Sequence, residues 1–183
     1  DVGAEKGERA AARLAAEGAH VEVIRGRLLP DDAVELVSRF DLCVEGADNF
    51  ATKFLASDAC RLASVPLVQA GVVRWSGWAL CSLPRVHAAC LRCVFEDIPR
   101  DRVETCAEAG VVGPVVGVLG ALEAALAIRA LLGDERVAGE LWSYSALRGV
   151  LRASRVRPRE GCESCRGAIP TPLTAERYAP PEC

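Results

Sequence analysis

Two Cys-x-x-Cys motifs constrain the fold of this chain more than any other feature of its sequence. The first motif contains Cys90 and Cys93, and the second contains Cys162 and Cys165. Two thiolates at this spacing can bind one side of a tetrahedral zinc ion, and a second pair can complete the coordination. A shared structural zinc would therefore tie a segment near the C-terminus to the middle of the chain. Free or disulfide-bonded cysteines and a thioredoxin-like redox pair are the alternatives that this spacing leaves open.

The size and composition of the chain favour a single globular unit. Its 183 residues are 51% hydrophobic, which is enough for one substantial core but too little for two ordinary domains. Disulfide-rich chains are usually too small to build such a core, so the nine cysteines favour metal binding in a reducing compartment. We therefore expect a cytoplasmic protein.

The charge pattern indicates the kind of partner that the chain binds, and the first residues indicate where the chain begins within its protein. The net charge is −3, and no run of Lys or Arg is present. Neither a nucleic-acid groove nor attraction to an anionic membrane surface is indicated, so we expect a protein or small-molecule partner. The chain contains no Met, and its first residues, Asp1-Val2-Gly3, resemble neither a natural start nor a signal peptide. We therefore expect it to be part of a longer protein.

Strand patterns and helical patterns alternate along most of the chain. Helices are predicted over 5–17, 33–38 and 49–64, and strands over 21–24, 42–44, 66–71, 75–83, 141–145 and 150–155. Residues 84–110 have mixed charge and little periodicity, which predicts a long loop, and residues 168–183 predict an irregular tail. The alternation indicates an α/β fold with a largely parallel sheet and flanking helices.

The segment 111–132 is apolar over about the length that spans a bilayer. Glu123 and Arg129 interrupt it, and charged residues inside a membrane span are costly. Glycines at positions 113, 117 and 120 recur at helical spacing and would let a helix lie close to a sheet. We therefore expect a buried core helix and no membrane span.

Asp48 and Asn49 follow a predicted buried strand and precede a predicted helix. In parallel α/β sheets, ligands collect at the carboxyl ends of the strands, where a carboxylate can hold Mg²⁺ beside phosphates. Either residue could instead cap the helix without any ligand. The pattern does not decide between these two roles.

Cys106 lies in the predicted loop, a few residues before the glycine-rich helix. A loop cysteine near a helix N-terminus can have a lowered pKa and act as a nucleophile. An unreactive thiol is the alternative. The two histidines, His20 and His87, are expected at the surface, so no catalytic metal with an open coordination position is indicated.

Several stretches, taken in order, resemble the MoeB/ThiF (HesA/MoeB/ThiF) family of adenylyltransferases, which are relatives of ubiquitin-activating enzymes. The resemblance extends from Asp1 to about Gly167. It is carried by the D-x-G-x-x-K pattern that ends at Lys6, by Asp48-Asn49-Phe50 with Cys60, by Gly71 to Gly77 with its Arg74, by Thr105 to Val111 followed by Gly113 to Gly117, and by the two Cys-x-x-Cys pairs.

The resemblance implies an adenylation domain over 1–167, with a Rossmann-like fold whose N-terminal nucleotide-binding part precedes this chain. It implies that ATP and Mg²⁺ are bound and that the C-terminal glycine of a ubiquitin-like sulfur-carrier protein ending in Gly-Gly is adenylated. The pathway would be molybdopterin or thiamine synthesis or related sulfur transfer. A homodimer is also implied.

The resemblance also implies roles for individual residues. Asp48 would hold Mg²⁺, Lys6 would contact the ATP phosphates, and Asn49 would line the nucleotide pocket. Cys106 matches a position that forms a covalent link in some members of the family. The four paired cysteines, Cys90, Cys93, Cys162 and Cys165, would bind a structural zinc.

The chain departs from the family pattern at four positions. Glu45 replaces a usual Asp, Lys53 a usual Arg, Ser57 a usual Asn and Trp78 a usual Gln. The main alternative is a zinc-stabilised module that binds a ubiquitin-like partner without catalysis. A dinucleotide-dependent oxidoreductase would share the fold class, but the chain contains no G-x-G-x-x-G motif.

Overall fold

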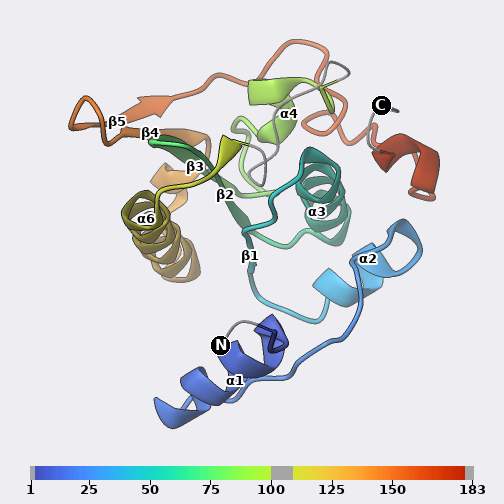
Figure 1. Ribbon diagram of the computed structural model, residues 1–183. Coiled ribbons are helices and arrows are strands. Elements are labelled where there is room, and N and C mark those ends of the chain that lie inside the picture. The colour runs from blue at the N-terminus through green and yellow to red at the C-terminus, as the bar shows by residue number, and fades with distance from the viewer. Residues whose placement is uncertain (1–2, 100–108, 180–183) are drawn as a thin grey trace.

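The computed structural model describes residues 3–99 and 109–179, and these residues form one five-stranded sheet in the order β1-β2-β3-β4-β5 (Figure 1). The strands are β1 (Cys43–Glu45), β2 (Leu67–Val73), β3 (Ser76–Ser82), β4 (Glu140–Ser145) and β5 (Val150–Arg155). β1 and β2 are parallel, whereas the other three neighbouring pairs are antiparallel. The prediction of a largely parallel sheet is therefore wrong for the described residues. The physical reason is that short turns join β2 to β3 and β4 to β5, and a short turn can connect only antiparallel neighbours.

Helices lie on both faces of this sheet. In the described parts of the chain, the helices are α1 (Lys6–Ala16), α2 (Pro30–Val37), α3 (Phe50–Ala63), α4 (Leu91–Phe95) and α6 (Gly113–Leu131), with two 3₁₀ helices, η1 (Glu135–Val137) and η2 (Ala175–Tyr178). Figure 1 shows α3 and α6 on opposite sides of the sheet. The fold is therefore α/β with a mixed sheet between two helical layers.

Strand β2 separates two hydrophobic cores because its side chains alternate between the two faces of the sheet. Leu67 belongs to the core on the α3 side, together with Phe54 and Cys60. Val68 belongs to the core on the α6 side, together with Leu119. Both faces of β2 are buried, so this strand fixes the positions of α3 and α6 relative to each other.

Residues 21–24, predicted as a strand, do not form one. β-Branched residues favour strands mainly where a neighbouring strand can pair with them, and no strand of the described sheet pairs with this segment. Helix α1, which precedes it, contains no buried residue. The predicted loop 84–110 contains the short helix α4 in its described part. Cys106 lies outside the described residues.

Helix α6 packs against β2 and β3 along one face only. Val115, Leu119 and Leu126 are buried on that face, while Val116 and Ile128 are exposed. By length and composition α6 is the one helix of the described residues that could cross a membrane, with 22% of its apolar window buried. The buried helix predicted for this segment is thus a sheet-covering helix whose outer face is apolar.

The close approach of α6 to the sheet occurs at a glycine that was not predicted. A Cβ on Gly113, Gly117 or Gly120 would meet no atom within 4 Å, so these helix glycines do not face the sheet. A Cβ on Gly77 of β3 would instead lie 2.6 Å from the carbonyl oxygen of Gly71 and 3.2 Å from Cγ of Leu119. The small residue that permits close packing is therefore on the strand.

Substituting Gly77 with Ala is expected to lower the free energy of unfolding by about 2–3 kcal/mol, because the neighbouring backbone must move to admit the methyl group. Gly120→Ala is the matched control, since it adds the same methyl group in open space on a helix. It is expected to raise stability by about 0.5–1 kcal/mol. Urea denaturation of both variants measures the difference, and equal stabilities would contradict the close approach of the Gly71 carbonyl oxygen to Gly77.

Candidate functional site

The two Cys-x-x-Cys motifs meet in space, as the sequence predicted. The Sγ atoms lie 3.9 Å apart for Cys90 and Cys93, 3.7 Å for Cys90 and Cys162, 3.5 Å for Cys93 and Cys165, and 3.5 Å for Cys90 and Cys165. A tetrahedral zinc with Zn–S bonds of about 2.3 Å places its sulfur ligands about 3.8 Å apart. All four sulfurs lie within 4.8 Å of one another. The donor set and its spacing therefore fit zinc.

Hydrogen bonds distribute the protons of this cluster unequally. The hydrogen bond from Cys165 lowers the pKa of Cys90 to about 5, and the same contact raises the pKa of Cys165. The backbone N–H of Arg159 also donates to Sγ of Cys93 at 3.2 Å. A thiolate that already accepts hydrogen bonds is a good first ligand, and binding of a cation would release the remaining thiol protons.

Asp48 and Asn49 lie at the carboxyl end of β1, and both are exposed. Oδ1 of Asn49 accepts a hydrogen bond from the backbone N–H of Thr52 at 2.8 Å, so Asn49 caps α3. Nδ2 of Asn49 donates to Oδ1 of Asp48 at 3.3 Å. The Asn49 side chain therefore caps α3 with its oxygen and orients the Asp48 carboxylate with its nitrogen. The Asp48 side chain remains exposed to solvent.

A buried ion pair supports the loop that carries Asp48. Nζ of Lys53 lies 3.0 Å from Oε2 of Glu45, and it also donates to the carbonyl oxygen of Ala70. The other carboxylate oxygen of Glu45 accepts from the backbone N–H of Ala47. Nε2 of Gln69 donates to the Lys53 carbonyl oxygen at 2.9 Å. The Glu45 side chain thus holds the loop after β1, and the buried Lys53 fixes the Glu45 side chain in turn.

Three of the four positions that depart from the family pattern lie together in this cluster. Lys53 pairs with Glu45, and its ammonium lies 5.7 Å from the ring centroid of Trp78. A cation over an aromatic ring is stabilised by the charge distribution of the ring. The departures are therefore mutually compatible. Glu45 in place of Asp and Lys53 in place of Arg still form an acid–base ion pair.

Glu123 of α6 is a further carboxyl group close enough to sense this ion pair. Burial raises the pKa of Glu123 to about 7, although the positive charge of Lys53 acts in the opposite direction. Oε1 of Glu123 is buried without a hydrogen-bond partner among the described residues. The folded protein therefore holds a proton on Glu123 at pH values where the unfolded chain has lost it.

Stability is expected to fall as the pH rises from about 4.5 through 7, because the unfolded chain ionises Glu123 in that window and the folded protein resists it. Glu123→Gln removes the titratable carboxyl group without changing the size or shape of the side chain. The variant should match the parent at pH 4 and exceed its unfolding free energy by about 1–2 kcal/mol at pH 8. Urea denaturation at both pH values tests this, and an equal difference at the two pH values would contradict it.

Lys6 is not brought together with Asp48 and Asn49 by any described contact. It begins α1, an exposed helix that Figure 1 shows apart from the α3 and α6 layers. The structure thus assembles the cysteine cluster and the Asp48–Asn49 pair, and it places Lys6 on a separate element.

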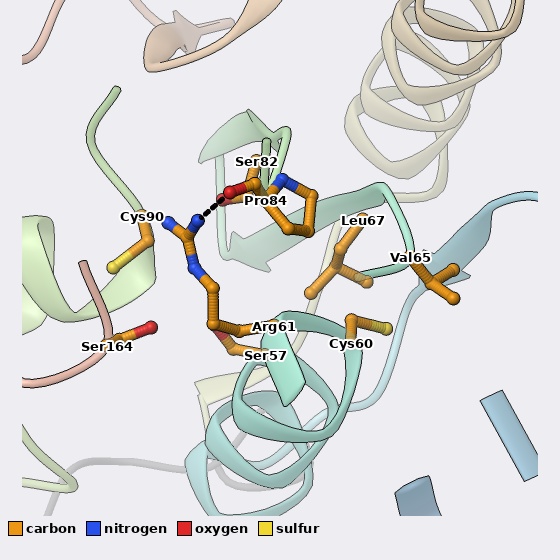
Figure 2. A pocket seen from close by; sticks show the side chains of 9 residues that line it. All are labelled: Ser57, Cys60, Arg61, Val65, Leu67, Ser82, Pro84, Cys90 and Ser164. Atoms are coloured by element: carbon orange, nitrogen blue, oxygen red, sulfur yellow. Dashed lines mark hydrogen bonds between the residues drawn. The ribbon is translucent and has the colours of Figure 1, made fainter. Parts of the chain in front are cut away.

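A small cavity is lined by residues of α3, β2 and β3 and by one residue of each Cys-x-x-Cys motif, and Asp48 is not among its lining residues (Figure 2). It is lined by Ser57, Cys60, Arg61, Val65, Leu67, Ser82, Pro84, Cys90 and Ser164. The enclosed space is about 10 Å³, which is room for about one water molecule and far less than the roughly 300 Å³ of the smallest usual ligand pockets. Nη1 of Arg61 donates to the Pro84 carbonyl oxygen at 2.6 Å. The cavity therefore does not serve as the nucleotide site.

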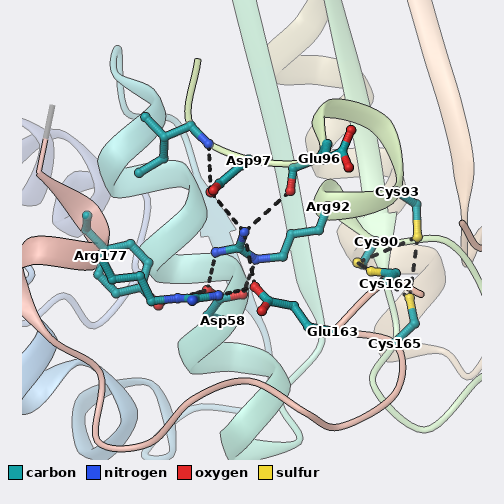
Figure 3. Close-up of polar contacts among 12 residues, drawn as sticks. Asp58, Cys90, Arg92, Cys93, Glu96, Asp97, Cys162, Glu163, Cys165 and Arg177 are labelled. Atoms are coloured by element: carbon teal, nitrogen blue, oxygen red, sulfur yellow. Dashed lines mark hydrogen bonds and ion pairs between the residues drawn. The ribbon is translucent and has the colours of Figure 1, made fainter. Parts of the chain in front are cut away.

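The sequence did not predict a buried ion-pair network that joins α3 to both cysteine motifs (Figure 3). Asp58 of α3 is fully buried and pairs with Arg92, and Arg92 also contacts Glu163. One feature of the sequence could have indicated this network. Each motif has a charged residue between its cysteines, Arg92 in the first and Glu163 in the second, and these charges must come close together if the four cysteines do. Helical periodicity alone does not identify a partner for a buried Asp.

Comparison with known proteins identifies the family and several relatives of this chain. The ThiF family model matches residues 1–166. A sulfur carrier protein adenylyltransferase of Thermus thermophilus is 38% identical over 179 residues, which are 93% of this chain and 66% of that protein. A sulfur carrier protein ThiS adenylyltransferase of Escherichia coli is 34% identical, with 82% and 59% covered. The adenylyltransferase and sulfurtransferase MOCS3 of Bos taurus is 39% identical, with 82% and 33% covered.

A solved structure supports the same fold. The crystal structure of E. coli MccB with succinimide superposes with a TM-score of 0.69 at 20% identity, covering 90% of this chain and 52% of that one. The chain spans about one third to two thirds of the length of the curated relatives described above. The family match and the identities of 34–39% over most of the chain show that this chain is a member of the ThiF family.

Proposed function

We propose that the protein containing this chain adenylates the C-terminal glycine of a ubiquitin-like sulfur-carrier protein with ATP. The observation that carries the proposal is the exposed Asp48 carboxylate, oriented by Asn49 at the carboxyl end of β1, in a chain whose relatives are named sulfur-carrier adenylyltransferases. A Rossmann-like nucleotide-binding fold, a homodimer and a cytoplasmic location are parts of the same proposal.

In the proposed reaction, a carboxylate oxygen of the carrier glycine attacks the α-phosphorus of ATP. A new oxygen–phosphorus bond forms while the bond from the α-phosphorus to the bridging oxygen of pyrophosphate breaks. The products are the acyl-adenylate and pyrophosphate. Both reactants are anions, so the site must align them and compensate their negative charge.

The residues of this chain supply part of that requirement. Asp48 would hold Mg²⁺, which supplies positive charge near the phosphates when it is bound. Asn49 would line the nucleotide pocket and keep the Asp48 carboxylate in place. Lys6 would contact the ATP phosphates. Cys106 is proposed as a nucleophile in a step after adenylation, in which its thiolate attacks the glycine carbonyl carbon of the acyl-adenylate, a thioester bond forms, and AMP leaves as the carbon–oxygen bond to the phosphate breaks.

The proposed zinc site has a structural role. Its four ligands are all cysteine thiols, which leave no coordination position for substrate once a tetrahedral zinc is bound. It also lies by α4 and the residues after β5, whereas Asp48 and Asn49 lie between β1 and α3. Molybdopterin synthesis, thiamine synthesis and related sulfur transfer are the pathways that fit this chemistry.

Exchange of labelled pyrophosphate into ATP tests the proposal in the full-length protein. Exchange should require a carrier protein ending in Gly-Gly, and a carrier lacking the terminal glycine is the matched control. Binding of the carrier without any exchange would overturn the enzymatic proposal and favour a non-catalytic, zinc-stabilised module that binds a ubiquitin-like partner.

A further inference from the structure

We propose that the cysteine centre and the Asp58 network form a metal-dependent clasp that holds residues 169–178 against α3. Each Cys-x-x-Cys motif carries one charged residue between its cysteines, Arg92 in the first and Glu163 in the second. These two side chains meet, with Nη1 of Arg92 3.3 Å from Oε1 of Glu163. The two motifs are therefore joined twice, through sulfur and through charge.

Asp58 is the centre of the network. It is 0% exposed, and its two carboxylate oxygens accept hydrogen bonds from Nε of Arg92 at 3.0 Å and from Nη2 at 2.7 Å. This two-point contact is the strong geometry for an arginine and a carboxylate. The hydroxyl of Tyr178 also donates to Oδ2 of Asp58 at 2.8 Å. A residue of α3 thus binds the first cysteine motif and the C-terminal segment at the same time.

The C-terminal segment has apolar and polar attachments. Ile169, Leu173 and Tyr178 are buried in the core on the α3 side. Arg177 pairs with Glu163 and lies 3.5 Å from Oδ2 of Asp58. Figure 3 shows Arg177, Asp58 and Arg92 converging beside the four cysteines. Although residues 168–179 are mostly irregular, their buried side chains pack against the core on the α3 side.

A bound metal would hold the clasp closed, because its ligands come from two segments far apart in sequence. Without metal, the two motifs are held together by the Arg92–Glu163 ion pair and by packing, and no longer by metal–sulfur bonds, so their separation costs less free energy. Loss of metal should therefore favour opening of the network and release of the segment. This role is separate from adenylation.

Limited trypsin digestion of the full chain, with zinc bound and after removal by a chelator, tests the clasp. Cleavage after Arg166 and Arg177, followed by mass spectrometry, is expected to become at least about tenfold faster when zinc is removed. Cleavage after Arg25, whose side chain is 80% exposed, is the internal control and should change less than about twofold. Equal cleavage after Arg177 in both forms would overturn the proposal. So would a parallel rise after Arg61 of α3, which would indicate unfolding of the whole domain.

A conservative variant separates the clasp from general folding. Tyr178→Phe removes only the hydroxyl that binds Asp58, so zinc content should stay the same while cleavage after Arg177 becomes about tenfold faster with zinc bound. Tyr144→Phe is the matched control, because Tyr144 lies on β4 in the other core. Unchanged protection of Arg177 in Tyr178→Phe would overturn the role of Asp58 as the centre of the clasp.

Discussion

Replacing Asp48 with Ala is expected to reduce carrier-dependent pyrophosphate exchange by at least about a hundredfold. The reaction brings a carboxylate toward a polyphosphate, and Asp48 is the residue proposed to hold the cation that offsets their charge. The substitution should hardly affect folding, since Asp48 is exposed and accepts a hydrogen bond only from the neighbouring Asn49 among the contacts described above. The unfolding free energy should therefore change by less than about 0.5 kcal/mol.

The matched control for this experiment is Asp41→Ala. Asp41 is also exposed and lies just before the opposite end of β1, so the variant removes an equal charge from the wrong end of the strand. Exchange should remain within about twofold of the parent protein. If Asp48→Ala retained most of the exchange, the proposed metal ligand would lie elsewhere. That result would leave open to separate test whether exchange requires the carrier protein.

Replacing Cys165 with Ala is expected to lower the free energy of unfolding of the zinc-loaded protein by about 3–5 kcal/mol. Structural zinc contributes its binding energy directly to folding, and here it would join α4 to the segment after β5. The loss should be less than the full binding energy, because three thiols remain and the apolar cores persist. Urea denaturation with parallel measurement of bound zinc gives the result.

Metal-free protein provides the decisive comparison for Cys165→Ala. After chelation, the cost of Cys165→Ala should fall to about 1 kcal/mol, because the thiol then contributes only its hydrogen bonds with Cys90 and the Ala88 carbonyl oxygen. Cys43→Ala is the control for loss of a cysteine outside the cluster and should cost about 1 kcal/mol. An equal cost of Cys165→Ala with and without zinc would assign its effect to packing and contradict the metal site.

Local patterns predicted the elements around the site well. The segment from Asn49 to Ser64 was predicted as a helix, and α3 spans Phe50–Ala63 with Asn49 as its cap. The strands that became β2, β3, β4 and β5 were also predicted. These elements follow from side-chain periodicity and from a capping residue, which act between residues close in sequence.

Long-range pairing explains what local patterns did not predict. The run at 21–24 has strand-forming residues but no described partner strand. The antiparallel pairing of β3 with β2 and of β5 with β4 follows from the short turns between them. The partner of Lys53 is Glu45 on a neighbouring element, and the partners of Asp58 come from α4 and from the C-terminal segment. A pattern within one element carries no information about such contacts.

The sequence by itself indicated the four cysteines that could hold a metal ion and placed Asp48 and Asn49 before a helix, because thiol spacing and helix capping depend on neighbouring residues. Only the tertiary structure decided the mixed sheet, the close contact at Gly77, the raised pKa of Glu123 and the burial of Asp58. Each of these depends on which distant segments are packed together, since burial and charge compensation are set by the surroundings of a side chain in space.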